Sequence, residues 1–257
     1  MLLDAVVIVL REVLEAALLI SLLLALSRLT ETGIRWLLVA FASGGLAALG
    51  YAANIAVISE SFDYAGQELL NASLQGVIWL AVLGLFIFSQ RRPYQHQVLA
   101  LFMALTVALA LARELSEILL YVQSYGEVSG NMPTVLAGAL IGLVTGSSIG
   151  VLMYFSLLWL GQPRIISNLA HGFLAVVIGG ILTQSVSLLE QVDYLPALAP
   201  LWDSSSWLPE RSLAGQLLYA LLGYEATPSA WHLAAYLLGL GSLAAVFFWQ
   251  RRIWSCA

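Results

Sequence analysis

The sequence predicts an all-α integral membrane protein with seven transmembrane helices, built from two inverted three-helix repeats plus a seventh helix. Three observations support this fold class. The chain is 61% hydrophobic and only 10% charged, it contains seven long apolar runs, and a short charged motif occurs in the first and the fourth of them. Ordinary soluble domains are about 45–50% apolar and about 25% charged. The composition therefore disfavours a water-soluble fold of this length and excludes a disordered chain.

Each apolar run is long enough for a helix that crosses a bilayer, which needs about 20 residues. We expect the spans at residues 3–27, 36–58, 69–89, 97–122, 134–160, 168–189 and 231–249. The first run does not resemble a cleaved signal peptide, because no basic residue precedes Arg11 and charged residues interrupt the run. It is therefore expected to remain as the first helix.

An internal repeat organises these spans. Arg11-Glu12-Val13-Leu14-Glu15 recurs 102 residues later as Arg113-Glu114-Leu115-Ser116-Glu117. Three spans separate the two copies, and an odd number of spans reverses the direction of the chain. Inverted repeats are typical of transporters, whose substrate site lies near mid-membrane between the repeats. We expect one transmembrane domain, 1–257, made of repeat one at 1–90, repeat two at 91–190, an outer loop at 191–230 and helix seven at 231–249.

Four glycines mark one face of the fifth span. They stand at a strict four-residue spacing, as Gly138, Gly142, Gly146 and Gly150. Small residues at this spacing allow two helix backbones to approach closely in a membrane. We interpret this face as a packing surface.

Arginine placement predicts the orientation of the chain. Seven arginines fall in alternate breaks or at the C-terminus: Arg28, Arg35, Arg91, Arg92, Arg164, Arg251 and Arg252. Basic residues concentrate in cytoplasmic loops, so we expect the N-terminus outside and the C-terminus in the cytoplasm. The opposite side holds nine acids and one arginine, which would raise the local concentration of cations. The expected location is the plasma (inner) membrane.

The composition also excludes several kinds of chemistry. The chain contains no lysine, which removes Schiff-base chemistry and the P-loop lysine that binds nucleotide phosphates. A net charge of −5 leaves no basic surface for nucleic acid. The single cysteine, Cys256, allows no intrachain disulfide.

The doubled motif places an excess of carboxylates inside the membrane. Residues three or four apart share a helix face, so Glu12 and Glu15 lie together, as do Glu114 and Glu117. Asp4 lies near the same stripe, toward the outer mouth. Each charge costs roughly 2.5–3.5 kcal/mol at a helix centre, so these residues must face each other inside the bundle.

Four carboxylates face only two arginines in this cluster, and a bound cation would balance the difference. A salt-bridge cluster that only fixes packing is the alternative, and we favour a cation pathway because the motif occurs twice. Carboxylate oxygens suit hard cations such as ferric iron, Mn²⁺, Mg²⁺ and Ca²⁺. Among the histidines, His171 is expected to make a polar core contact, whereas His96 and His232 are expected at the surface.

These residues resemble the oxidase-dependent iron permease family of fungi and bacteria. The family carries an Arg-Glu-x-x-Glu motif in the first and the fourth of seven helices, and this sequence has both, as REVLE and RELSE. Residues 202–237 also look like the family's outer loop, with its Trp-Asp-x-Ser start and a later Leu-Gly-Tyr and Pro-Ser. Val13 and Leu115 stand where the family usually has glycine, and these larger side chains could tighten the passage.

The resemblance implies iron import by a transporter that is not an enzyme. Carried over to this chain, the motif glutamates Glu12, Glu15, Glu114 and Glu117 would be the iron ligands, and Arg11 and Arg113 their charge partners. Residues at which iron could enter are Asp4, Glu68, Glu190 and Asp203. Iron, ferric or ferrous, would be the substrate, with no permanent cofactor. An extracytoplasmic ferroxidase or iron-binding protein would be the partner.

Three other functions remain open from the residues alone. The first is a permease for another divalent cation, such as manganese or lead, on the same scaffold. The second is an intramembrane hydrolase that uses paired glutamates as acid and base, although such enzymes also need membrane histidines to hold a water. The third is a non-transporting scaffold or receptor subunit, which would leave the excess carboxylates without a role.

Overall fold

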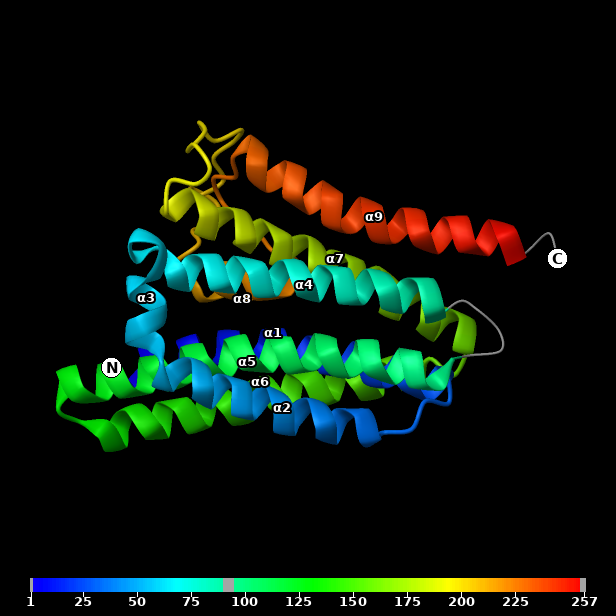
Figure 1. Ribbon diagram of the computed structural model, residues 1–257, viewed down its shortest axis with the longest axis horizontal. Helices are drawn as coiled ribbons and strands as arrows, with labels where there is room; N and C mark the ends of the chain where they lie inside the picture. Colours follow the sequence, from blue (N-terminus) through cyan, green and yellow to red (C-terminus); the bar gives the residue numbers. More distant parts are fainter. Residues whose placement is uncertain (1, 90–94, 255–257) are drawn as a thin grey trace.

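The computed structural model describes residues 2–89 and 95–254, and within them the chain is helical with no strand. The helices are α1 (Leu2–Leu29), α2 (Arg35–Ala53), α3 (Ile55–Tyr64), α4 (Gly66–Ser89), α5 (His96–Ser129), α6 (Met132–Trp159), α7 (Pro163–Gln191), α8 (Leu213–Leu222) and α9 (Ala230–Trp254). The long helices lie lengthwise beside one another, and the connections between them gather at two ends (Figure 1).

Six of these helices are long and apolar enough to cross a membrane: α2, α4, α5, α6, α7 and α9. The predicted all-α, multi-pass membrane protein is thus confirmed. With 28 residues, α1 is also long enough, but it carries Asp4, Arg11, Glu12 and Glu15 along its first half. The count of seven spans depends on α1 and stays a prediction.

The two ends of the bundle differ in charge. One end, which we call the arginine end, carries Arg28 in the last turn of α1, Arg35 at the start of α2 and Arg164 at the start of α7. The other, the acidic end, carries acids at the start of α4 and at the ends of α5 and α7: Glu68, Glu127 and Glu190. Helix α1 begins at the acidic end and α9 finishes at the arginine end (Figure 1). Arg91 and Arg92, two of the predicted anchors, lie outside the described residues.

Close helix pairs hold the bundle together. The glycine face of α6 packs along α1: a Cβ placed on Gly142 would lie 2.7 Å from the Val6 carbonyl oxygen. The predicted packing surface is confirmed. Gly44 of α2 meets α5 in the same way, because its Cβ would lie 2.7 Å from the Ala108 carbonyl oxygen. Glycine permits both contacts because it has no side chain to displace the neighbouring backbone.

The apolar core fills the half of the bundle nearer the arginine end. It contains the buried Leu22 and Leu26 of α1, Phe86 of α4, Met103 of α5 and Leu174 of α7. The first half of α1 and the middle of α5 hold the charged motifs instead. The core therefore closes the bundle at the arginine end and leaves polar side chains in the other half.

Two predicted segments differ from the structure. The second predicted span, 36–58, is broken at Asn54, which separates α2 from α3. The side-chain amide of Asn54 donates to the Gly50 carbonyl oxygen at 2.8 Å. Within α3 the backbone leaves the helical region at residues 61–63, and Phe62 and Asp63 have positive φ angles. The predicted span thus ends in a bent connection to α4.

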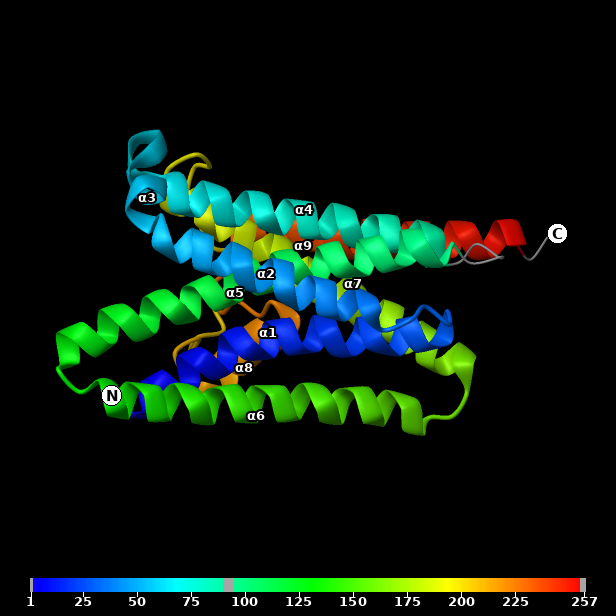
Figure 2. The same cartoon turned by 60° about the horizontal axis from the view of Figure 1, so that its bottom comes forward.

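The predicted outer loop, 191–230, is not a surface loop throughout, because it contains the ten-residue helix α8. The Ser212 hydroxyl caps its start by accepting from the Gly215 amide at 3.0 Å, and Gly223 ends it with a φ of +68°. Ala220 packs against Leu14 and Leu18 of α1. Figure 2 shows α8 lying beside α1. The segment is too short to span a bilayer, so it enters the bundle and returns to the same end.

Candidate functional site

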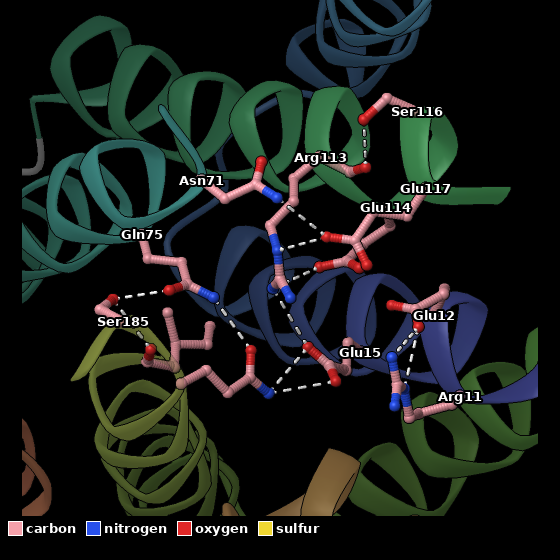
Figure 3. A network of polar contacts seen from close by, with 12 residues as sticks. Arg11, Glu12, Glu15, Asn71, Gln75, Arg113, Glu114, Ser116, Glu117 and Ser185 are labelled. Carbon is pink, nitrogen blue, oxygen red and sulfur yellow. Dashed lines mark hydrogen bonds and ion pairs between the residues drawn. The ribbon is translucent and has the colours of Figure 1, made fainter. Parts of the chain in front are cut away.

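Side-by-side packing of α1 and α5 brings the two motifs together at one level of the bundle (Figure 3). The centre of the cluster is Arg113, whose side chain is 9% exposed. Its Nη1 lies 3.0 Å from Oε1 of Glu114 and 3.4 Å from Oε2 of Glu15. Its Nε lies 3.2 Å from Oε1 of Glu117. One buried guanidinium therefore contacts three carboxylates.

The first motif arginine has different surroundings. Arg11 donates to Oε1 of Glu12 from Nε at 2.9 Å and from Nη2 at 2.5 Å. Its side chain is 35% exposed, and its guanidinium carbon lies 5.8 Å from the ring centre of Tyr219 in α8. The two copies of the motif thus share a sequence but not an environment.

Three carboxylates of the cluster could hold one cation. One oxygen from each of Glu12, Glu114 and Glu117 lies within 4.8 Å of the other two. Oε2 of Glu12 and Oε2 of Glu114 are buried and accept no hydrogen bond. A buried oxygen without a partner is costly, and a hard cation with oxygen ligands would satisfy both. Within the described residues, no other group of three or more histidines, cysteines or acids brings its ligand atoms this close together.

Glu15 is turned toward other partners. Gln184 of α7 donates from Nε2 to both Glu15 oxygens, each at 3.2 Å. Gln75 of α4 donates in turn to Oε1 of Gln184 at 3.0 Å, and the Ser185 hydroxyl donates to Oε1 of Gln75 at 2.6 Å. The fourth predicted ligand therefore lies beside the three-carboxylate group and not within it.

A polar cavity of about 350 Å³ leads to the cluster from the acidic end. Glu12, Glu117 and Arg11 line it together with Glu68 at the start of α4 and Tyr121 near the end of α5. Oε2 of Glu68 and the Tyr121 hydroxyl are buried atoms that make no hydrogen bond. The full lining is Ile8, Arg11, Glu12, Gln67, Glu68, Asn71, Glu117, Leu120, Tyr121, Leu188 and Gln191.

The predicted entrance residues lie in different places. Glu68 lines the cavity, whereas Asp4 is exposed near the start of α1. Glu190 accepts from the Ser229 hydroxyl at 3.1 Å, and it does not line the cavity. Asp203 is exposed, and two hydrogen bonds from Ser205 hold its pKa below the ordinary value. The structure therefore brings one of the four, Glu68, to the cavity.

Two of the three histidine predictions are confirmed. His171 is buried, with its Nε2 3.0 Å from the Ser89 hydroxyl and its ring 4.7 Å from that of Phe86, and His96 is exposed. The prediction for His232 is wrong. Its side chain is buried because the first turn of α9 packs on the end of α7, where Nε2 lies 3.0 Å from the Ser187 hydroxyl.

Sequence reasoning missed the amide side chains around the cluster. Asn71 donates to Oε1 of Glu117 at 3.3 Å and accepts from the Tyr51 hydroxyl at 3.2 Å. Gln75 and Gln184 are buried in the network that ends at Glu15. A signal was present, because an amide in the middle of an apolar span is costly unless it is hydrogen-bonded.

Val13 stands where the resemblance predicts glycine, and its surroundings explain how the larger side chain is accommodated. Val13 is buried, and its Cγ1 would lie 2.8 Å from a Cβ placed on Gly146 of α6. The side chain therefore packs against the glycine face of α6 and does not enter the carboxylate cluster. Leu115 is partly buried and packs against the apolar core.

Comparison with known proteins agrees with the motifs and the helices. The sequence model of the iron permease FTR1 family matches residues 2–249. The chain is 27% identical over 256 residues to the ferrous iron permease EfeU of Escherichia coli O157:H7 and, equally, to that of Shigella sonnei strain Ss046. Each alignment covers 91% of this chain and 90% of the relative. No solved structure matches the chain. Because the family match spans nearly its whole length, the chain belongs to the FTR1 iron permease family.

Proposed function

We propose that the protein imports ferrous iron and that the ion binds first between Glu12, Glu114 and Glu117. Membership of an iron permease family makes the protein an iron transporter and not an enzyme. The observation that carries the proposed site is the pair of buried, unpartnered carboxylate oxygens on Glu114 and on Glu12, of which Glu12 lines the polar cavity. The relatives' description as ferrous iron permeases supports the ferrous state.

Charge balance also favours a divalent ion. The four motif glutamates and two motif arginines sum to −4 + 2 = −2 when all are ionised. One Fe²⁺ would bring this sum to zero, whereas Fe³⁺ would leave one positive charge inside the membrane, which is costly. Mn²⁺ carries the same charge and accepts the same oxygen ligands, so it is the competitor that must be tested.

We further propose that α1 is a seventh span and that α1, α2 and α4 form one repeat and α5, α6 and α7 the inverted second. The packing supports this assignment, because two close pairs between the proposed repeats have counterparts: α1 with α6 corresponds to α5 with α2, and α1 with α7 corresponds to α5 with α4. The hydrogen bonds follow the same pattern. Gln184 of α7 bonds Glu15, and Asn71 of α4 bonds Glu117.

The proposed orientation places the acidic end outside and the arginine end in the cytoplasm of a plasma (inner) membrane. Arginines near three helix ends support it through the preference of basic residues for the cytoplasmic side. The cavity then opens to the outside, where an iron-binding protein would supply ferrous iron. A ferroxidase would deliver ferric iron instead, so it does not fit the proposed ferrous substrate. Glu68 and Tyr121 stand along the path from the outside to the carboxylates.

The test is uptake of radioactive iron, kept ferrous by a reductant, into liposomes that contain the purified protein. Glu114→Gln and Glu117→Gln should each lower the uptake rate at least tenfold, because each removes a charged ligand. Glu127→Gln is the matched control, since Glu127 lies on the same helix and is exposed. Unlabelled Mn²⁺ and Pb²⁺ should compete less well than Fe²⁺. Undiminished uptake in both cluster variants would overturn the proposed site, and better competition by Mn²⁺ would reassign the substrate.

A further inference from the structure

We propose that Gln184 is a positioning residue: it holds Glu15 in place to accept the Arg113 guanidinium when the ion binds between Glu12, Glu114 and Glu117. This inference rests on the proposed function, because it concerns the loading of that site. In this proposal Glu15 pairs with the Arg113 guanidinium in the loaded site. Gln184, Gln75 and Ser185 contribute to transport because they hold Glu15 in position.

The position of Arg113 conflicts with a cation in the proposed site. Arg113 contacts Glu114 and Glu117, which are two of the three proposed ligands. A cation bound to these oxygens would repel the guanidinium strongly in a buried site, since like charges a few ångströms apart interact with little screening there. Arg113 must therefore move away from them when the ion arrives.

Arg11 could be solvated by water after it leaves its carboxylate partner, but Arg113 could not. Arg11 lines the cavity with 35% of its side chain exposed, so water can solvate it when Glu12 turns to the ion. Arg113 is only 9% exposed, and arginine keeps its proton in proteins. A buried charge without a partner is strongly destabilising. Arg113 therefore needs a protein acceptor that the ion does not occupy.

Glu15 meets this requirement. Among the carboxylates that pair with Arg113 in the described structure, Glu15 is the one outside the three-carboxylate group. Its Oε2 already lies 3.4 Å from Nη1 of Arg113, a distance that a small movement of the guanidinium would shorten. The transfer breaks two ion pairs with Glu114 and Glu117 and strengthens one that exists.

The amide network fixes Glu15 for this task. An ionised carboxylate only accepts hydrogen bonds, so Gln184 must present its amino group to Glu15. Oε1 of Gln184 is then left to accept from Gln75, and Oε1 of Gln75 to accept from the Ser185 hydroxyl. Each donor direction follows from the charge on Glu15. The chain of contacts ties α1 to α7 and α4 and keeps both Glu15 oxygens in place beside Arg113 (Figure 3).

The experiment measures Fe²⁺ affinity by anaerobic calorimetry on the purified full chain, with thermal stability recorded for every variant. Gln184→Met should weaken binding about tenfold, and Glu15→Gln should weaken it more. The double variant should bind no worse than Glu15→Gln, because Gln184 acts through Glu15. Gln216→Met in α8 is the matched control, since its side-chain amide donates to the Arg211 carbonyl oxygen at 3.4 Å and not to the carboxylate cluster. Its affinity should equal that of the wild type.

A second double variant separates an acceptor from a ligand. Arg113→Gln with Glu15→Gln removes the guanidinium and its acceptor together, so the net charge is unchanged. Under the proposal this variant regains an affinity within about threefold of the wild type, because no buried cation has to move. If Glu15 were a ligand in the loaded site, the affinity would stay as low as in Glu15→Gln alone, and that result would overturn the proposal.

Two further outcomes keep the inference separate from the proposed function. If Gln184→Met fails to fold, Gln75→Met tests the same network one contact further from Glu15 and should weaken binding by a smaller factor, about threefold. Loss of binding in Glu114→Gln together with unchanged binding in the Gln184 or Gln75 variants would leave the site standing and overturn the positioning role. Equal binding by the wild type and Glu114→Gln would remove the proposed site itself.

Discussion

Gly142 of α6 lies directly against Val6 of α1, so close that a methyl group on Gly142 would stand 2.7 Å from the Val6 carbonyl oxygen and 2.9 Å from the Leu10 amide nitrogen. The neighbours are backbone atoms of a packed helix and cannot turn aside. Gly142→Ala should therefore push α6 away from α1 and lower the free energy of unfolding by about 1–3 kcal/mol. Thermal unfolding in detergent measures the change.

Gly45→Ala is the control for this substitution. Gly45 lies in helix α2 with no atom within 4 Å of the position where its Cβ would stand. Alanine is a better helix former than glycine by about 1 kcal/mol, so this variant should be as stable as the wild type or more stable. A Gly142→Ala protein as stable as Gly45→Ala would show that α6 does not pack on α1 as described.

The cap of α8 gives a second prediction. The Ser212 hydroxyl accepts from the Gly215 amide, and α8 carries Tyr219 to a position over Arg11. Ser212→Ala should cost about 1 kcal/mol of stability, whereas Ser212→Asp should retain the cap. The same unfolding assay compares the two. Equal losses in both variants would indicate that the hydroxyl does not cap the helix.

Local sequence explains the predictions that succeeded. The low charge and long apolar runs are sufficient to indicate helices in a membrane, because a membrane helix satisfies its own backbone and exposes its side chains to lipid. The recurrence of Arg-Glu-x-x-Glu is likewise a property of the chain itself. The strict spacing of Gly142 and Gly146 predicted a packing face, and α1 occupies it.

Tertiary contacts explain what the sequence left open. Arg11 and Arg113 stand in nearly identical local sequences, yet one borders a cavity and the other is enclosed by three carboxylates. Only the arrangement of the other helices creates that difference. The predicted surface position of His232 was wrong for a similar reason, because its burial depends on α7, which is more than forty residues away. The partners of Glu15 also come from distant helices.

The connection between α8 and α9 gives a pH prediction. Burial, followed by the nearby Glu210 and Glu190, raises the pKa of Glu225 from the ordinary 4.5 to about 7. The folded protein therefore holds this proton more tightly than the unfolded chain does. The resulting stabilisation is complete below about pH 4.5 and is lost as the pH rises through 7. The melting temperature of the wild type should fall across this window.

Glu225→Gln isolates the effect of this carboxyl group. The variant cannot ionise at this position. The decrease in melting temperature that Glu225 causes between pH 4.5 and 7 should therefore be absent. Above pH 7 the variant should be more stable than the wild type, and at pH 4.5 the two should be similar. A pH profile that is the same in both proteins would contradict a raised pKa at Glu225.

Val13 stands at the position where the resemblance to the family predicts glycine. Because Val13 packs against Gly146 of α6, Val13→Gly should leave a space between α1 and α6 and should not widen the carboxylate site. The buried side chain contributes about 2 kcal/mol, and glycine in a helix costs about 1 kcal/mol more than alanine. The free energy of unfolding should therefore fall by about 3 kcal/mol. Iron uptake per folded molecule, and competition by Mn²⁺, should match the wild type. A shift in preference between the two ions would mean that Val13 acts on the site after all.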